Sequence, residues 1–169
     1  MHQKIVVIFL FLFVQAFGQE NTSLTSQDLY TKDGLVYKVS NDSIFSGSIE
    51  NRRSNDVLLS KTDFKEGRIM LYSEYYNKSK KGIPCRKIYY HENLVLKKKK
   101  EDKLDFDGKI YLSTYFDENE NKILEESFSE GKLVYSCEYK NGKKNGKQFC
   151  LSKNGEELNF IYENGKKVK

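Results

Sequence analysis

The chain of 169 residues contains only two His and three Cys, the residues around which Ser-His-Asp or Cys-His catalysis is built. Once a signal peptide at the N-terminus is set aside, His91 is the remaining histidine, so a Ser-His-Asp or Cys-His site would have to form around it. Cys85 precedes it without a recognisable partner pattern, and His91 itself stands among turn-forming residues. We therefore interpret His91 as a solvated turn residue and predict that the protein is not an enzyme.

Metal-binding patterns are equally weak. No two Cys or His residues have the short spacing that structural zinc sites use. The acidic stretch 117–121 (DENEN) has some likeness to a calcium-binding loop. However, Lys122 stands where the turn glycine is needed, and Phe128 stands where the bidentate Glu is needed. We interpret the stretch as a hairpin tip of solvated acids, and we expect no metal and no cofactor.

Cys137 and Cys150 are the two residues that could form a covalent link. They flank the expected turn Asn141–Gly146, and disulfides persist in the oxidising compartments to which exported proteins go. A hairpin that is symmetric about Lys143 and Lys144 would set the two cysteines directly opposite each other, close enough to bridge.

The apolar pattern favours a register shifted by one residue. Tyr139 then lies opposite Phe149 and Cys137 lies opposite Leu151, with all four on the buried face. A shift of one residue exchanges the faces of every side chain, so the two registers exclude each other. We prefer the shifted one, in which Cys137 is a small buried hydrophobe and no disulfide forms.

Two surface features could bind a partner. The first is a set of lysines that could form one basic edge. It comprises the cluster Lys78–Lys81, the run Lys97, Lys98, Lys99 and Lys100, and Lys143, Lys144, Lys166, Lys167 and Lys169. Our preferred interpretation is that such lysines lie at strand edges and turns, where they prevent sheets from aggregating; the alternative is a basic edge facing an anionic surface. The second is a set of rings at alternating positions, Tyr135, Tyr139 and Phe149. Most of them should pack, yet on a single-layer sheet some could stack on a partner protein or a sugar.

The elements that would carry these residues are marked by a recurring phrase: an aromatic residue, two mostly polar residues, Gly and Lys. The copies are 128–132, 139–143 and 162–166, with a looser one at 151–155. Asn-Gly is the strongest short hairpin signal because Gly adopts positive φ without steric cost. We predict turns at Gly131, Gly142, Gly146, Gly155 and Gly165. The runs between them are β-rich, and no segment has an apolar stripe at helical spacing.

A regular period supports a repeat array. Gly108 and Gly131 are 23 residues apart, as are Gly142 and Gly165, and superposing the two segments matches Tyr115 with Phe149. Charged residues make up 31% of the chain and aromatic residues 14%, which suits a thin sheet with rings on one face and Lys and Glu on the other. The predicted fold class is therefore all-β, an elongated antiparallel sheet of successive β-hairpins.

The repeats at 139–147 (YKNGKKNGK) and 162–166 (YENGK) resemble the bacterial variant of the MORN repeat. The segment from Asp33 to Gly47 is similar to the atypical first repeat of such proteins. The resemblance implies an elongated sheet of hairpins, and proteins of this type are often labelled antitoxins of toxin–antitoxin systems (the YwqK family). This chain departs from the pattern because it has no Trp, and because Asn93 and Asn119–Asn121 stand where a turn Gly is expected.

The N-terminus has the pattern of a secretory signal peptide: Lys4 is followed by ten apolar residues, Ile5–Val14, and then by small residues up to Gly18. Ten apolar residues are too short to span a bilayer, which takes about twenty. We expect a signal peptide at 1–18, a flexible tether at 19–27 and a repeat domain at 28–169, in a protein that is secreted or resides in the periplasm or cell envelope.

These observations predict a secreted, non-enzymatic binding module whose partner is another protein. Two alternatives stay open: an antitoxin or immunity-type protein that neutralises a toxin, and an envelope protein that binds anionic lipid through a basic edge. The formal net charge of +5 is too small to indicate a nucleic-acid partner.

Overall fold

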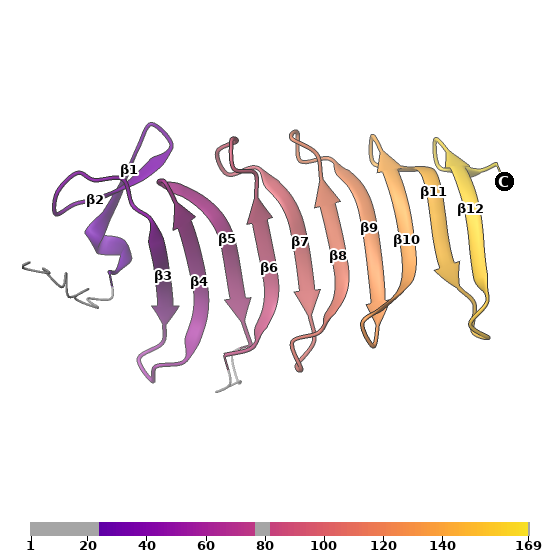
Figure 1. Cartoon of the computed structure of the whole chain (residues 1–169), viewed down its shortest axis with the longest axis horizontal. Helices are drawn as coiled ribbons and strands as arrows, with labels where there is room; N and C mark the ends of the chain where they lie inside the picture. Colours follow the sequence, from indigo (N-terminus) through magenta and orange to yellow (C-terminus); the bar gives the residue numbers. More distant parts are fainter. Residues whose placement is uncertain (1–23, 77–81, 169) are drawn as a thin grey trace, which may run out of the picture.

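The computed structural model describes residues 24–76 and 82–168, and nearly all of this part is β-structure (Figure 1). A short 3-10 helix, η1 (Ser26–Asp28), precedes a two-stranded sheet of β1 (Leu29–Lys32) and β2 (Leu35–Lys38). All later strands form one antiparallel sheet of 11 strands, hydrogen-bonded in the order of the sequence. They are β3 (Gly47–Arg52), β4 (Leu58–Lys65), β5 (Arg68–Tyr75), β6 (Pro84–Tyr90), β7 (Lys98–Leu104), β8 (Ile110–Phe116), β9 (Lys122–Ser129), β10 (Lys132–Lys140), β11 (Lys143–Leu151), β12 (Glu157–Glu163) and β13 (Lys166–Lys167). The predicted fold class, an elongated sheet of successive hairpins, is confirmed.

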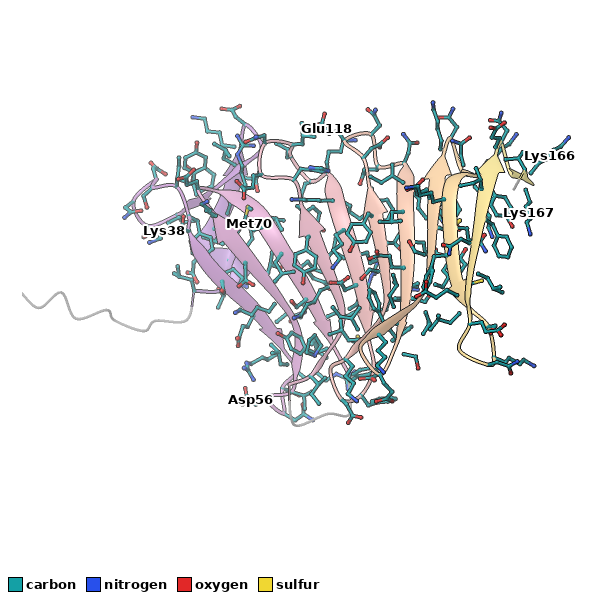
Figure 2. All side chains as sticks on the ribbon, turned by 45° about the vertical axis from the view of Figure 1, so that its right-hand side comes forward. Lys38, Asp56, Met70, Glu118, Lys166 and Lys167 are labelled. Carbon is teal, nitrogen blue, oxygen red and sulfur yellow. The ribbon has the colours of Figure 1, made fainter. Side chains whose placement is uncertain are left out.

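The large sheet is a single layer, and side chains project from both of its faces (Figure 2). Within the described residues few side chains are buried. The apolar ones are Phe45, Ile88, Leu104 and Cys137, and the polar ones are Ser73, Asp102, Ser113 and Gln148. A core this thin must be supplemented by side-chain pairs between neighbouring strands, which are the unit of stabilisation in a sheet.

Two kinds of turn connect most of the strands. In the first, a Gly follows Asp, Glu or Asn and both residues have positive φ, as the tight turns of right-twisted hairpins require. These turns are Asp33-Gly34, Glu66-Gly67, Glu130-Gly131, Asn141-Gly142 and Asn164-Gly165. The second kind spans five residues, and its fourth residue has positive φ: Asp105–Lys109, Asp117–Asn121 and Ser152–Glu156. Gly131, Gly142 and Gly165 thus lie in tight turns, and Gly155 lies in a five-residue turn.

The acidic tip Asp117–Asn121 is a regular turn, although it has no Gly. Glu120 adopts the positive φ of 63°, and the Asp117 carboxylate accepts hydrogen bonds from the backbone N–H groups of Asn119 (2.9 Å) and Asn121 (2.8 Å). The Asn121 side chain, the largest influence, holds the pKa of Asp117 below its ordinary value, and these backbone contacts add to the effect. The turn is therefore regular although Asn119–Asn121 stand where a turn Gly is expected, because Glu120 adopts the positive φ and the Asp117 carboxylate orders the backbone.

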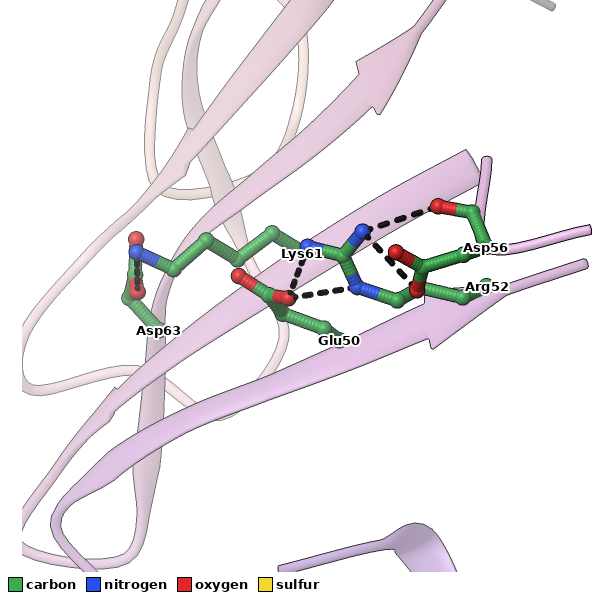
Figure 3. A network of polar contacts seen from close by, with 5 residues as sticks. All are labelled: Glu50, Arg52, Asp56, Lys61 and Asp63. Carbon is green, nitrogen blue, oxygen red and sulfur yellow. Dashed lines mark hydrogen bonds and ion pairs between the residues drawn. The ribbon is translucent and has the colours of Figure 1, made fainter. Parts of the chain in front are cut away.

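The N-terminal end of the sheet is closed by a small apolar contact and a charged edge. Phe45 is 2% exposed, and its ring centre lies 5.3 Å from that of Phe64. Beside the edge strand β3, Arg52 contacts the Glu50 carboxylate at 2.7 Å and the Asp56 carboxylate at 3.4 Å (Figure 3). Charged side chains of this kind discourage another sheet from pairing with an exposed edge.

The β10–β11 register differs from both registers considered above. Cys137 lies opposite Gln148, Cys150 lies opposite Tyr135, and Tyr139 lies opposite Lys144. Both expected pairings are wrong because the hairpin turns at Asn141-Gly142, two residues earlier than assumed, and a bulge then absorbs the extra residues.

Gly146 is a further correction. It lies inside β11 and not in a turn. Its φ of 103° accommodates the bulge, and a Cβ at this position would collide with the Glu138 carboxylate. Glu138 also accepts a hydrogen bond from the Lys147 backbone N–H at 2.8 Å.

The expected separation of faces is also wrong. Cross-strand partners share a face, so Tyr135 and Cys137 lie on one face, whereas Phe149 lies with its partner Ser136 on the other. Superposing Tyr115 on Phe149 matched strands β8 and β11, which are three strands apart and therefore run in opposite directions. The structural repeat is two strands long, so the residue equivalent to Phe116 is Tyr139.

The expected signal peptide at 1–18 lies outside the described residues, as does the lysine cluster at 78–81. The tether expected at 19–27 also lies mostly outside them. Its last residues belong to η1, where Thr25 and Asp28 form a reciprocal capping contact.

Candidate binding surface

One arrangement repeats along the large sheet. An aromatic residue near the end of one strand lies opposite a lysine near the start of the next, on either side of the turn. The pairs are Tyr90–Lys98, Phe116–Lys122, Tyr139–Lys144 and Tyr162–Lys167. We call these residues the lysine–aromatic row. It crosses β6 to β13 close to the loops at the upper margin of Figure 1.

Three lysines of the row also reach the ring of the following hairpin, and the fourth reaches a second ring of its own hairpin. The ammonium of Lys98 lies 5.3 Å from the centre of the Phe116 ring, that of Lys122 lies 3.7 Å from Tyr139, and that of Lys144 lies 5.1 Å from Tyr162. Lys167 lies 3.6 Å from the ring centre of Phe160. Cations and rings therefore alternate without a break, and each such contact contributes roughly 0.5–1 kcal/mol at an exposed site.

Bulges place the row on its face. A register shift falls between Tyr89 and Tyr90, and another falls between Tyr115 and Phe116. The third shift falls directly before Tyr139. Bulges strengthen the local twist and re-aim the side chains beside them. Their recurrence at the same point of three of the four hairpins helps to explain why the row is continuous although the intervening sequences differ.

Three cations of the row, Lys98, Lys122 and Lys144, are half-buried. The Lys122 side chain is 32% exposed and pairs with Glu125 at 3.1 Å. Burial by itself would lower the pKa of Lys122. The hydrogen bond to Glu125 and the nearby Tyr139 raise this pKa by more than burial lowers it, so the net shift is upward. Lys144 donates a hydrogen bond to the Gln148 side-chain oxygen at 2.9 Å. Lys167 is exposed.

A second cluster lies on the opposite face, around Asp102. The Asp102 side chain is 1% exposed and contacts the Lys100 ammonium at 2.9 Å. Ser113 donates a hydrogen bond to the same carboxylate at 2.6 Å. The Lys100 ammonium also lies 5.7 Å from the ring centre of Tyr89 and 5.3 Å from that of Tyr115.

The Tyr115 hydroxyl extends this polar network by donating a hydrogen bond to Glu126 at 2.9 Å. Burial, together with that hydrogen bond, raises the pKa of Tyr115 to about 12. Because its charged groups satisfy one another inside the sheet, we interpret the Asp102 cluster as structural.

The residues predicted as a binding surface are divided between these environments. Tyr135 and Tyr139 lie on the face of the row, where Lys144 approaches the Tyr135 ring centre to 5.8 Å. Phe149 lies on the other face.

The four consecutive lysines also separate. Lys97 pairs with Glu120 at 3.5 Å, Lys98 belongs to the row, Lys99 is exposed beside the bulge, and Lys100 belongs to the Asp102 cluster. The expectation that these lysines lie at a sheet edge or turn is wrong for Lys98–Lys100, because they begin β7, a central strand. The alternation of side chains along β7 and the bulge thus place four consecutive lysines in different environments on the two faces of the sheet.

Sequence reasoning missed Tyr90, Phe116, Lys122 and Tyr162 as binding residues, and it included Lys144 and Lys167 only among the lysines of the alternative basic edge. The signal was present in part, since the recurring phrase places an aromatic residue before each turn and a lysine after it. This phrase does not by itself predict a continuous row, because the cross-strand pairing depends on bulges that the sequence does not mark.

His91 is half-buried and not fully solvated. Its backbone N–H donates to the Lys97 carbonyl at 2.9 Å, and its Nε2 atom is buried without a hydrogen-bond partner. Within residues 24–76 and 82–168, no group of three or more His, Cys, Asp or Glu side chains is placed to hold a metal ion. No helix in the same ranges is long and apolar enough to cross a membrane.

Comparisons with known proteins leave the chain without an assigned family. No family model and no curated relative matches it. Among solved structures, the GtfA/B complex bound to UDP and GlcNAc matches with 8% identity and a TM-score of 0.45, over 60% of this chain and 22% of that one. TarM of S. aureus matches with 7% identity and a TM-score of 0.42, over 70% and 21%. The pneumococcal O-GlcNAc transferase GtfA matches with 16% identity and a TM-score of 0.41, over 62% and 20%. The chain thus spans about a fifth of each of these proteins, and the similarity is too low to support a functional assignment.

Proposed function

We propose that the chain is an exported, non-catalytic binding module that holds an elongated partner across several strands of its sheet. The observation that carries this proposal is the lysine–aromatic row, in which four cations and four rings recur at the two-strand repeat. Repeat proteins commonly present extended surfaces of this type, on which one contact is multiplied along an array.

A non-catalytic role is supported by three potentially reactive side chains that are buried or already paired. The Asp102 carboxylate is neutralised by Lys100, and Cys137 is 1% exposed. Burial is the main cause that raises the pKa of the Cys85 thiol, which disfavours the reactive thiolate. None of these groups faces another in the pairing that nucleophilic catalysis needs.

The charge of the row favours an anionic partner. The ammonium of Lys98 lies against a ring, and that of Lys144 lies against two rings and an amide oxygen; neither contact is with a carboxylate. A lysine ammonium has three donors, so each retains capacity for an anion. The acidic surface of a protein, the partner class expected from the sequence, would meet this requirement.

The test is a capture experiment with the immobilised chain and extracellular material from its host. We expect a partner that elutes with salt and that is lost from a Lys122→Gln/Lys144→Gln variant, because charge contacts at exposed sites are screened by ions. A Lys147→Gln/Lys153→Gln variant removes the same charge from exposed positions outside the row and should still capture the partner. Equal capture by both variants would refute a binding role for the row.

A further inference from the structure

The spacing of the lysine–aromatic row restricts the partner more than its charge does. Neighbouring strands of a sheet lie about 4.8 Å apart, so groups that recur on every second strand repeat about every 9.6 Å. The row lysines lie on β7, β9, β11 and β13, and the row rings lie on β6, β8, β10 and β12. A ligand that matches the row must therefore be a linear chain that crosses the strands and carries one negative charge per repeat of this length.

The immediate surroundings of the row do not repel such a ligand. Glu125, on the same face, is paired with Lys122 at 3.1 Å. Glu101 is paired with Arg86 at 2.9 Å. Glu125 and Glu101 are thus neutralised locally. Glu120 lies beside Lys97 and Lys98 and offsets part of their charge, whereas the ammonium groups of Lys144 and Lys167 contact rings and an amide oxygen.

We propose that the row binds a linear acidic polysaccharide with one carboxylate or sulfate per disaccharide. This inference rests on the proposed function and names the partner of the same surface. An extended pyranose disaccharide has about the length of two strand spacings, about 9.6 Å, so one anion per disaccharide meets one lysine per hairpin. The rings of Phe116, Tyr139 and Tyr162 lie under the ammonium groups of the preceding lysines, which fixes the positions of these cations along the row.

The depth of the cations favours a thin chain over a flat surface or a peptide. The Lys122 side chain is two-thirds covered, with its ammonium close against the Tyr139 ring, so a thin chain reaches this cation more readily than a broad membrane surface does. An extended acidic peptide repeats its side chains on one face about every 6.6 Å, which falls out of step with the lysines after one repeat.

The binding experiment uses calorimetry with the whole chain and hyaluronan oligosaccharides, in which uronic acid alternates with N-acetylhexosamine. We expect affinity to rise with length until the oligosaccharide spans all four lysines, about eight sugars on the spacing given above. Oligosaccharides whose carboxylates have been reduced to alcohols should bind at least about tenfold more weakly, since each charge-assisted hydrogen bond is worth a tenfold factor or more.

The Lys122→Gln/Lys144→Gln variant should lose roughly tenfold or more in affinity for the octasaccharide, and the Lys147→Gln/Lys153→Gln variant should bind as the unaltered chain does. Circular dichroism and the unfolding temperature of each variant show whether the sheet is intact. If the row variant is not folded, the single variant Lys144→Gln provides the test, since it leaves the Lys122–Glu125 pair intact and should still lose affinity, whereas Lys144→Arg keeps the charge and should keep the affinity. Equal affinity of Lys144→Gln and the unaltered chain would overturn the proposal.

Three results would overturn the glycan assignment: equal affinity for reduced and unreduced oligosaccharides, affinity independent of length, or tighter binding to poly-glutamate or to vesicles containing phosphatidylglycerol. If oligosaccharides do not bind while capture from host material still depends on the row, the glycan assignment fails and the proposed binding function stands. If capture is also independent of the row, both fail.

Discussion

Removing either member of the buried Asp102–Lys100 pair should destabilise the sheet, and by unequal amounts. The Asp102 side chain is 1% exposed and the Lys100 side chain 26%. In Lys100→Met the carboxylate is left buried without its cation, and only the neutral hydroxyls of Ser113 and Tyr89 remain beside it. This is the situation in which breaking a buried pair costs about 3–5 kcal/mol.

In Asp102→Asn the shape is kept and the charge is lost. The ammonium left behind can turn toward water, and it keeps its contacts with the Tyr89 and Tyr115 rings. We therefore expect a smaller loss of about 1.5–3 kcal/mol, the range for a hydrogen bond to a charged group. An Asp102→Leu/Lys100→Met variant, with neither charge, should be more stable than Lys100→Met alone, because apolar replacements of buried pairs are often neutral.

Urea unfolding followed by circular dichroism measures these free energies. Lys103→Met serves as the control, since Lys103 is an exposed lysine on the same strand and its loss should cost less than about 0.5 kcal/mol. If Asp102→Asn proves as costly as Lys100→Met, or if both lose less than about 1 kcal/mol, the assignment of Asp102 as a buried, charged partner is wrong.

Three further outcomes are expected. Gly146→Ala should lower the free energy of unfolding by about 2–3 kcal/mol, because it combines a positive φ with a collision, whereas Gly142→Ala, with open space around it, should cost about 1 kcal/mol in the same urea titration. The neutral Tyr115 phenol stabilises the sheet fully below its ordinary pKa of 10, and this contribution disappears as pH rises through about 12. Tyr115→Phe should therefore be about 1 kcal/mol less stable at neutral pH. Its free energy of unfolding, measured against pH, should fall less steeply at alkaline pH than that of the unaltered chain. Cys137 and Cys150 are diagonal neighbours, so their Cα atoms lie about 7–8 Å apart, beyond disulfide reach; peptide mapping without reductant should find both thiols free, and a linked peptide pair would contradict the observed register.

Local sequence signals predicted the fold well, because the hairpin is a local structure. Asn141-Gly142 and Asn164-Gly165 are tight turns for the reason given by their residue types: Gly accepts positive φ and Asn tolerates it. Repetition of such turns without helical periodicity leaves a ladder of hairpins as the simplest arrangement.

The candidate surface was less predictable because it depends on register. The β10–β11 pairing is set by a bulge at Gly146, whose φ of 103° is not evident from sequence. Glu66, Glu120 and Glu130 also adopt positive φ, a conformation that Glu rarely selects by itself. One misplaced residue in a turn moves each ring and lysine to the other face, so Phe149 was grouped with Tyr135 although the two lie on opposite sides of the sheet.

The strand order of the large sheet also determines how it would respond to mechanical load. Each strand from β3 to β13 is hydrogen-bonded to its neighbours in sequence, so no strand is clamped between two distant segments. A pulling force on the C-terminal end would act first on β12 and β13 and would then open the following hairpins one at a time, as a zipper opens. The chain would unfold through a series of small extensions and not through one large rupture. A partner bound across several hairpins would carry part of the force and so delay their separation.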